Sequence, residues 1–317
     1  MIQQTEPAIE RMAYVGLTTA DAAGLCDFFE RALGFRLLAA GRRSVEELTG
    51  ISGAGGGAYR VTLGLGGEVI ELLQFERPGR PFPNAASAAD LRFQHFAIVV
   101  SDMEQAYQRL CAIGRWSAIS RDGPERLPAS SGGITAFKFR DPDGHPLELL
   151  SFPDGQLAPH WQARSNNHLS LGIDHSAIAV SDSARSIAFY EALGMRVAHS
   201  RNSGFEQGRA EGVGKPDLSV TAMQPRQSTP HLRLLQYRSR SNDQAVVVND
   251  NDVAATRLAF EAAPSSCGGP AEKQTLTDPD GHRLLILTSS EKKSSVTAAA
   301  AANPRAAPIS AKSDPAR

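Results

Sequence analysis

The sequence predicts an α+β protein made of four related modules with the order strand, helix and three strands, the last module being shortened. Three repeated features indicate this fold. An apolar strand that ends in Asp and is followed by a helical pattern occurs at Asp21, Asp102 and Asp182. An apolar final strand recurs as IELLQF, LELLSF and LRLLQY. The turn Asp-Pro-Asp-Gly begins at both Asp141 and Asp278.

The first module begins near Ile9 with an apolar strand. Apolar residues then recur at helical spacing over residues 22–33, and Gly34 supplies a stop signal. A strand over residues 35–39 and the two strands YRVTLGL and EVIELLQF complete the module. The final strand carries Glu71, a carboxylate among apolar side chains.

The second module opens with FQHFAIVVSD and continues as a helix over residues 103–112. It closes with a hairpin over residues 137–152, in which Pro142 and Gly144 set the turn. Glu148 stands among leucines on the last strand. An ionised carboxylate in such a place costs several kcal/mol unless a cation or a metal compensates it. We therefore expect Glu148 to be ionised and to lie beside a cation or a metal ion.

The third module opens with LGIDHSAIAVSD, and its final strand places Arg233 where Glu71 stands in the first module. His95 and His175 each stand seven residues before the Asp that ends the opening strand. The same offset in the first module leads to Tyr14, an aromatic side chain in place of imidazole.

The fourth module, expected to begin with NDQAVVVND, is shorter than the others between its Asp and its final turn. The last strand of this module has Leu285 at the position of Glu148. His145 and His282 follow the glycine of the two turns, and we expect them to face outward or to cap the hairpins.

Composition and charge narrow the class of protein. With 41% hydrophobic and 21% charged residues and a net charge of -1, nothing favours nucleic acid or an anionic membrane as a partner. No apolar run reaches the roughly 20 residues that span a bilayer, and the start has no apolar signal core, which favours a cytoplasmic protein. Residues 291–317 are rich in Ala, Ser, Pro and Lys, and we expect disorder there.

Taken together, these motifs resemble the vicinal oxygen chelate superfamily, which includes glyoxalase I, extradiol ring-cleaving dioxygenases and bleomycin-resistance proteins. The resemblance rests on the four modules, the xHxxIxVxD openings, the FFERALGF and FYEALGM helix ends and the two DPDGH hairpins. It implies that modules pair into cupped sheets around a divalent metal. Neighbouring modules would give an N-terminal domain over residues 9–153, a linker over 154–170 and a C-terminal domain over 171–290.

Carried over to this chain, the resemblance implies that Tyr14, Glu71, His95 and Glu148 line one cup. Glu71, His95 and Glu148 would be the metal ligands, a donor set that suits Fe, Mn, Ni, Co or Zn. Glu71 or Glu148 could act as general base. Tyr14 departs from the family pattern, which usually has His or Gln there, and is open as a ligand, a general acid or a packed aromatic.

The other cup would contain His175, Arg233, Asp243 and Leu285. Arginine and leucine replace two carboxylates, so the resemblance does not favour a metal there. We expect His175 to be a hydrogen-bonded wall residue without ligand partners, and Arg233 to be structural or to pair with the acid group of a ligand.

Three functions follow from the resemblance. The leading expectation is a metal-dependent lyase or isomerase of the glyoxalase type, acting on a small molecule with adjacent oxygens. One alternative is a metal-free binding protein of the bleomycin-resistance type. The other is an extradiol-type dioxygenase, which is disfavoured because such chemistry usually takes two histidines and one carboxylate, and the expected site has one histidine. Whether two chains form a homodimer is left open.

Overall fold

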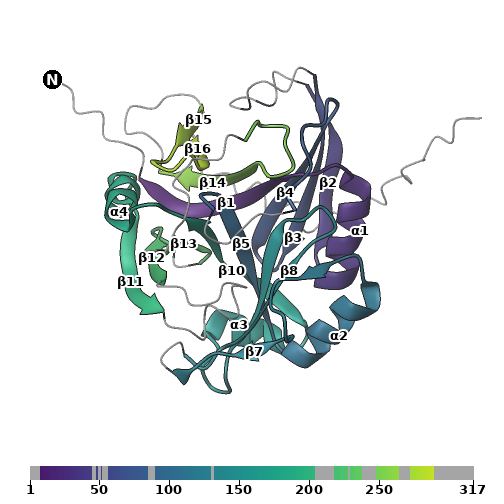
Figure 1. The fold of residues 1–317 in the computed structure, drawn as a ribbon, viewed down its shortest axis with the longest axis vertical. Helices are drawn as coiled ribbons and strands as arrows, with labels where there is room; N and C mark the ends of the chain where they lie inside the picture. Colours follow the sequence, from purple (N-terminus) through teal and green to yellow (C-terminus); the bar gives the residue numbers. More distant parts are fainter. Residues whose placement is uncertain are drawn as a thin grey trace, which may run out of the picture.

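The computed structural model describes residues 8–44, 48, 51, 56–84, 90–129, 132–203, 218–227, 229–237, 248–263 and 272–288. Within them the predicted α+β fold is confirmed, with the described strands forming two mixed sheets and short helices beside them (Figure 1). No helix in these ranges is long and apolar enough to cross a membrane. The predicted tail over residues 291–317 lies outside the described residues.

The first module follows its sequence signals closely. The Asp21 side chain accepts a hydrogen bond from the Gly24 amide at 3.0 Å and so caps the helix, and Gly34 ends the helix in a left-handed conformation with φ of 77°. Its elements are β1 (Ile9–Thr18), α1 (Ala22–Leu33), β2 (Arg36–Arg43), β3 (Ala58–Leu65) and β4 (Glu68–Phe75).

The second module has the predicted helix and hairpin and two additional two-residue strands. Its elements are β5 (Phe93–Val100), α2 (Met103–Ile113), β6 (Ser117–Ala118), β7 (Glu125–Arg126), β8 (Thr135–Arg140) and β9 (Pro146–Ser151). The expected linker over residues 154–170 contains a short helix, α3 (Pro159–Ser165), whose Trp161 is buried.

The third module is complete, whereas the fourth consists of three strands in the described residues. The third contains β10 (Ser170–Ala179), α4 (Ser183–Ala192), β11 (Arg196–Ser203), β12 (Leu218–Gln224) and β13 (His231–Tyr237). The fourth contains β14 (Thr256–Ala262), β15 (Glu272–Thr277) and β16 (Arg283–Thr288). Its opening strand β14 lies after Asp250, not before it as predicted, and residues 242–247 of the predicted opening segment lie outside the described residues.

The modules pair first with fourth and second with third, which corrects the expectation that neighbours pair. Sheet A has the order β15-β16-β14-β1-β4-β3-β2, and sheet B has the order β11-β12-β13-β10-β5-β9-β8-β6. The central contacts are antiparallel, between β1 and β14 and between β5 and β10. Neither residues 9–153 nor residues 171–290 therefore form a sheet alone. The opening strands share one apolar pattern, so the pattern alone could not specify the partner.

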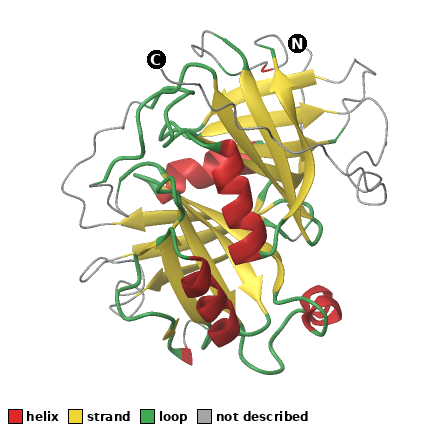
Figure 2. Cartoon of the chain, turned by 90° about the vertical axis from the view of Figure 1, so that its right-hand side faces the viewer, coloured by secondary structure: helices red, strands yellow, loops and turns green. Residues whose placement is uncertain are grey.

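One shared core lies between the inner faces of the two sheets and includes apolar residues of α1, α2 and α4. Figure 2 shows the two sheets with helices between them. Phe29 of α1 stacks on Phe96 of β5 at a ring-centroid distance of 6.3 Å, which joins the two sheets through the core. Because side chains alternate along a strand, the neighbours of these core residues lie on the other, cupped face of each sheet.

The two Asp-Pro-Asp-Gly-His turns connect the sheets. Their histidines were expected to face outward or to cap the hairpins: both are buried, so they do not face outward, and each hydrogen-bonds to the Asp that begins its own turn. Buried His145 lies with Nε2 2.9 Å from the Thr18 carbonyl oxygen and 3.0 Å from the Val253 carbonyl oxygen. In the second turn, Nε2 of buried His282 lies 2.8 Å from the Ala179 carbonyl oxygen. Each turn thus holds an element of the opposite sheet by hydrogen bonds, which fixes how the two sheets are placed.

Candidate metal centre

Three strands of sheet B bring two histidines and one carboxylate to the same part of its cupped face. His95 lies on β5, His175 on β10 and Glu148 on β9. The register places Ala97 beside both His175 and Glu148 on the neighbouring strands. Since Phe96 and Ile98 belong to the core, Ala97 and the residues beside it face the cup.

The ligand atoms of these three residues converge. The Nε2 atoms of His95 and His175 are 3.3 Å apart, and Oε2 of Glu148 lies 3.2 Å from the first and 3.6 Å from the second. Donors bound to one ion at about 2.1 Å lie about 3.0 Å apart at right angles and about 3.4 Å apart at tetrahedral angles. The three atoms therefore have the spacing of ligands on one face of a divalent metal, and all three side chains are buried.

His175 has the tautomer and the neutral ring that a metal ligand needs. Its Nδ1 donates to Oδ2 of Asp174 at 2.8 Å, which leaves Nε2 as the acceptor. Burial, with Arg233 and His231 nearby, keeps the pKa of His175 well below its ordinary value, so the ring is neutral. The expectation that His175 has no ligand partners is wrong, because that expectation depended on pairing the third module with the fourth.

Glu148 is a buried carboxylate with a cation beside it. Lys138, on the adjacent strand β8, places Nζ 3.8 Å from Oε1 of Glu148 and 3.4 Å from Nδ1 of His95. Burial alone would raise the pKa of Glu148, but the Lys138 charge and the contact with His95 hold it below its usual range. Glu148 is therefore ionised, and its cost of burial is partly offset by Lys138.

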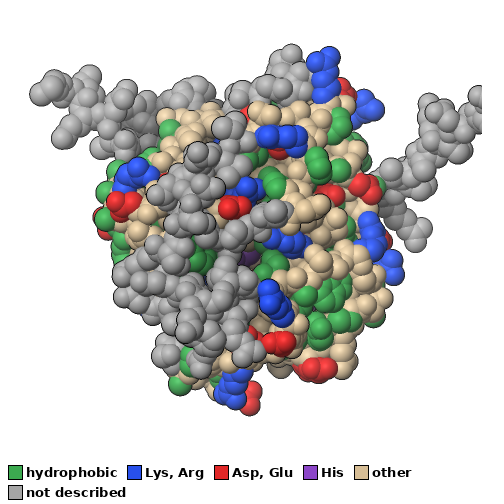
Figure 3. All heavy atoms as spheres, viewed as in Figure 1, with side chains coloured by type: hydrophobic (Ala, Val, Ile, Leu, Met, Phe, Trp, Pro, Cys, Tyr) green, Lys and Arg blue, Asp and Glu red, His purple; other side chains and the backbone are tan. Residues whose placement is uncertain are grey.

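The cup continues on the side of the third module with a second group of polar residues. Asp174, His175 and His231 also bring ligand atoms close together, and Arg233 Nη2 lies 3.6 Å from Oδ2 of Asp174. Burial lowers the pKa of His231 to about 4, although Asp174 opposes the shift. In the space-filling view, a small area of histidine is visible in a recess with Lys and Arg side chains beside it (Figure 3).

The structure does not bring Glu71 and Tyr14 to this cluster. Tyr14 lies on β1 and Glu71 on β4, both in sheet A, and Oε2 of Glu71 lies 3.4 Å from Nη1 of Arg60. Burial raises the pKa of Glu71, and burial with the nearby Glu71 charge raises that of Tyr14. Of the predicted ligands, His95 and Glu148 lie together, and His175 takes the place expected for Glu71.

Sequence reasoning missed Lys138 and Arg257 as residues of the two cups. Arg257 lies on β14 at the place in sheet A that corresponds to a histidine in sheet B. No motif marked Arg257, because the opening strand of the fourth module was expected elsewhere. Asp243, predicted for that position, lies outside the described residues.

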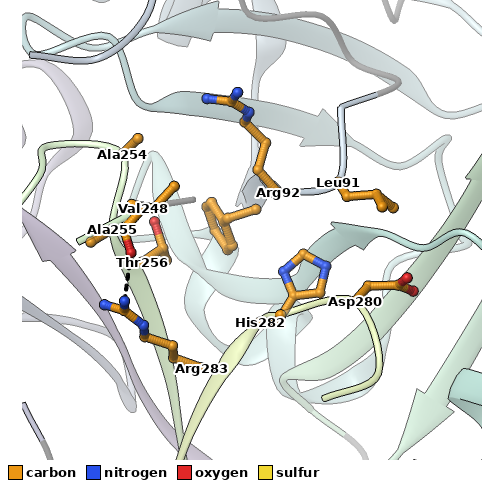
Figure 4. A pocket seen from close by; sticks show the side chains of 11 residues that line it. Leu91, Arg92, Val248, Ala254, Ala255, Thr256, Asp280, His282 and Arg283 are labelled. Atoms are coloured by element: carbon orange, nitrogen blue, oxygen red, sulfur yellow. Dashed lines mark hydrogen bonds between the residues drawn. The ribbon is translucent and has the colours of Figure 1, made fainter. Parts of the chain in front are cut away.

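A separate small pocket lies beside the turn before β16 (Figure 4). Its volume is about 70 Å³, and its lining includes Arg92, His282 and Arg283. Arg283 donates to the Val248 carbonyl oxygen at 2.6 Å, which ties this pocket to the start of the fourth module. None of the three converging ligands of sheet B lines it, and its size suits ordered water better than a substrate.

Fold and site together define a protein of paired βαβββ modules whose cupped sheet B carries a candidate metal centre. The chain belongs to the Glyoxalase/Bleomycin resistance protein/Dioxygenase superfamily, whose family model matches residues 11–149 and 172–286. No match to the sequence was found among curated proteins.

Solved structures with the same fold include a glyoxalase I and a candidate dioxygenase. Glyoxalase I from Zea mays superposes with a TM-score of 0.57 at 18% identity, over 88% of this chain and 92% of that chain. A candidate dioxygenase from Bacillus subtilis subsp. subtilis str. 168 superposes with a TM-score of 0.57 at 12% identity, over 89% and 86% of the two chains. At these identities the likeness establishes the fold and leaves the reaction to be argued from the site.

Proposed function

We propose that the chain is a metal-dependent enzyme that binds its metal through His95, His175 and Glu148 and acts on a small molecule with adjacent oxygens. The observation that supports this best is the convergence of three donor atoms at separations of 3.2 to 3.6 Å. The neutral His175 ring and the ionised Glu148 are also in the protonation states that metal ligands require.

The donor set favours oxygenase chemistry. Two histidines and one carboxylate on one face are typical of non-haem iron(II) oxygenases, whose iron supplies open coordination positions and redox chemistry for dioxygen. The lyase or isomerase reaction expected from the sequence depended on Glu71 as a second carboxylate, and Glu71 lies on sheet A. A ring-cleaving dioxygenase is therefore the reaction class that we favour.

The residues around the donors have distinct roles in this proposal. Asp174 fixes the tautomer and orientation of His175 through the 2.8 Å hydrogen bond to Nδ1. Arg233 lies beside Asp174 on the same face, where its guanidinium can orient an anionic substrate. Lys138, at 3.8 Å from Glu148, lies close enough to hold or deliver a proton beside the metal ligands.

Lys138 also favours a second candidate, a metal-free protein that binds small molecules. Its ammonium group already compensates the Glu148 charge, and its 3.4 Å contact with Nδ1 of His95 suits a ring that carries its proton on Nε2. In that case Nε2 of His95 donates to Glu148 at 3.2 Å and is not available to a metal.

Oxygen uptake by metal-loaded protein tests the proposal. Purified protein is loaded anaerobically with Fe(II), Mn(II), Co(II), Ni(II) or Zn(II) and is then mixed with catechol and air-saturated buffer. We expect oxygen consumption and ring-opened product with Fe(II) or Mn(II), at least 100-fold slower turnover for His175→Ala, and little change for Glu71→Gln. Metal binding without oxygen uptake would favour lyase or isomerase chemistry, and absence of metal binding would favour the metal-free alternative.

A cytoplasmic location stays a prediction, which cell fractionation would test. Whether two chains form a homodimer stays open, and light scattering of the purified protein would measure it.

A further inference from the structure

The cupped face of sheet A has its own group of polar residues at the positions that form the metal centre in sheet B. Gly16 lies opposite Arg257 of β14 and beside Glu71 of β4, as Ala97 lies opposite His175 and beside Glu148. Among the described residues, no cluster of His, Cys, Asp or Glu with metal-ligand spacing lies on this sheet. Its chemistry is therefore different from that of sheet B.

Arg257 is the central residue of this face. It is only 2% exposed, and its Nη2 donates to Thr18 Oγ1 at 3.0 Å and to the Asp250 carbonyl oxygen at 2.6 Å. Its Nε and Nη1 are buried and have no hydrogen-bond partner in the part of the chain that the structure describes. A guanidinium stays charged at any ordinary pH, and a buried donor left without a hydrogen-bond partner costs about 1 to 3 kcal/mol, or more when the group is charged.

The charge around Arg257 is unbalanced. Glu71 interacts with Arg60, Arg257 and Lys273 together, and its ion pair, at 3.4 Å, is with Arg60. None of the described carboxylates forms an ion pair with Arg257. The Tyr14 ring lies next to Arg257 across Gly16, so a neutral hydroxyl donor is close to the same place. The charges of Asp250 and Glu71 both act on Arg257, but Asp250 is paired with Arg283 and Glu71 with Arg60, so the surplus of positive charge makes this face attractive to an anion.

Apolar side chains lie beside the cationic group. The Arg257 guanidinium lies over the Phe75 ring, with its Cζ 5.7 Å from the ring centroid. Leu73 and Phe75 belong to a small apolar cluster that is separate from the shared core. A ligand that fits both features has a charged end and an apolar body.

We propose that the cupped face of sheet A binds a small organic carboxylate, with its acid group at Arg257, Lys273 and Tyr14 and its apolar body against the buried apolar cluster that contains Leu48, Leu73 and Phe75. Guanidinium and ammonium groups make strong charge-assisted hydrogen bonds to carboxylates, which would satisfy the open donors of Arg257. This site is independent of the metal centre in sheet B, and it stands or falls separately from the proposed reaction.

Calorimetric titration of the full-length, metal-free protein tests this site, with benzoate as the probe, benzamide as its neutral analogue and inorganic phosphate as a competing anion. We expect one benzoate per chain to bind through this site and benzamide not to bind. Arg257→Gln should weaken benzoate binding at least tenfold, and Lys273→Met should weaken it several-fold. His175→Ala, in the other cup, should leave it unchanged.

Equal benzoate affinity in wild type and Arg257→Gln would overturn the proposal, as would no benzoate binding at all. Tight phosphate binding without benzoate binding would also overturn it, because the ligand would then not be an organic acid. If Arg257→Gln does not fold, Lys273→Met and Tyr14→Phe carry the test: weaker binding in both supports the site, and unchanged binding in both contradicts it. Loss of benzoate binding in His175→Ala would place the ligand in sheet B and contradict the assignment.

Discussion

Nε2 of His95 lies 3.3 Å from Nε2 of His175, although 80 residues separate the two histidines in the chain. The contact exists because β5 and β10 are antiparallel neighbours in sheet B, each opening a different module. The candidate metal centre is thus assembled from the second and third modules, and Glu148 of β9 completes it. Its chemistry follows from how the modules pair.

Asp174→Ala should weaken metal binding without removing it. The Asp174 carboxylate accepts the Nδ1 proton of His175 at 2.8 Å, and residues in this position typically contribute a factor of about 10 to 100 in metal affinity. We expect a change of that size in a competitive titration with a chromogenic chelator. Asp27→Asn, which changes a carboxylate on the exposed side of α1, is the matched control and should bind metal as wild type does. An unchanged affinity for Asp174→Ala would mean that His175 does not bind the metal.

Lys138→Met should make the stability of the protein depend on metal. Removal of the ammonium group leaves the buried Glu148 carboxylate without its nearest cation, which costs on the order of 3 kcal/mol in metal-free protein. A bound divalent ion then replaces the lost charge. We therefore expect a lower Tm without metal and recovery of most of the loss in saturating metal. A Tm that stays low in the presence of metal would support the metal-free binding function.

The free energy of unfolding should fall between about pH 7 and pH 9.5 because of His145. Its ring nitrogens face only acceptors, the Asp141 carboxylate and the carbonyl oxygens of Thr18 and Val253, so the buried ring is an imidazolium. Burial opposes this state, but Asp141 dominates and raises the pKa of His145 to about 9.

The direction of this pH dependence follows from proton linkage. The folded state binds the His145 proton more tightly than the unfolded state, whose pKa is about 6.5, so the contribution is complete below that pH and is lost as the pH rises through about 9. The shift corresponds to about 3 kcal/mol. Urea unfolding from pH 6 to 10 measures it, and His145→Gln should flatten the curve. An equally steep curve in His145→Gln would assign the effect to other groups.

The local structure could be predicted from the sequence because its signals are local. Asp21 and Gly34 mark the two ends of α1, and the structure places the helix between them. Glu148 could be singled out because a carboxylate among leucines needs a cation or a metal beside it, and the structure places Lys138 next to it and two histidines at metal-ligand spacing.

The partnership between modules could not be predicted in the same way. Any opening strand could pair with any other on the basis of its apolar pattern, and the pairing that folds is set by long-range packing such as the His145 contacts across the sheets. The site was therefore expected to contain Glu71 and to lack His175. The similar motifs around His95 and His175 could have indicated the site. The two histidines occupy corresponding positions in their modules, and such positions lie close together when those modules pair.

Metal binding by the wild-type chain and two variants tests the central claim most directly. Metal-free protein is titrated by calorimetry with Fe(II) under anaerobic conditions and with Zn(II) in air, using wild type, His175→Ala and Glu71→Gln. The two-histidine, one-carboxylate centre predicts one metal per chain, at least 100-fold weaker binding in His175→Ala and unchanged binding in Glu71→Gln. Loss of binding in Glu71→Gln with full binding in His175→Ala, or no binding to the wild-type chain, would contradict it.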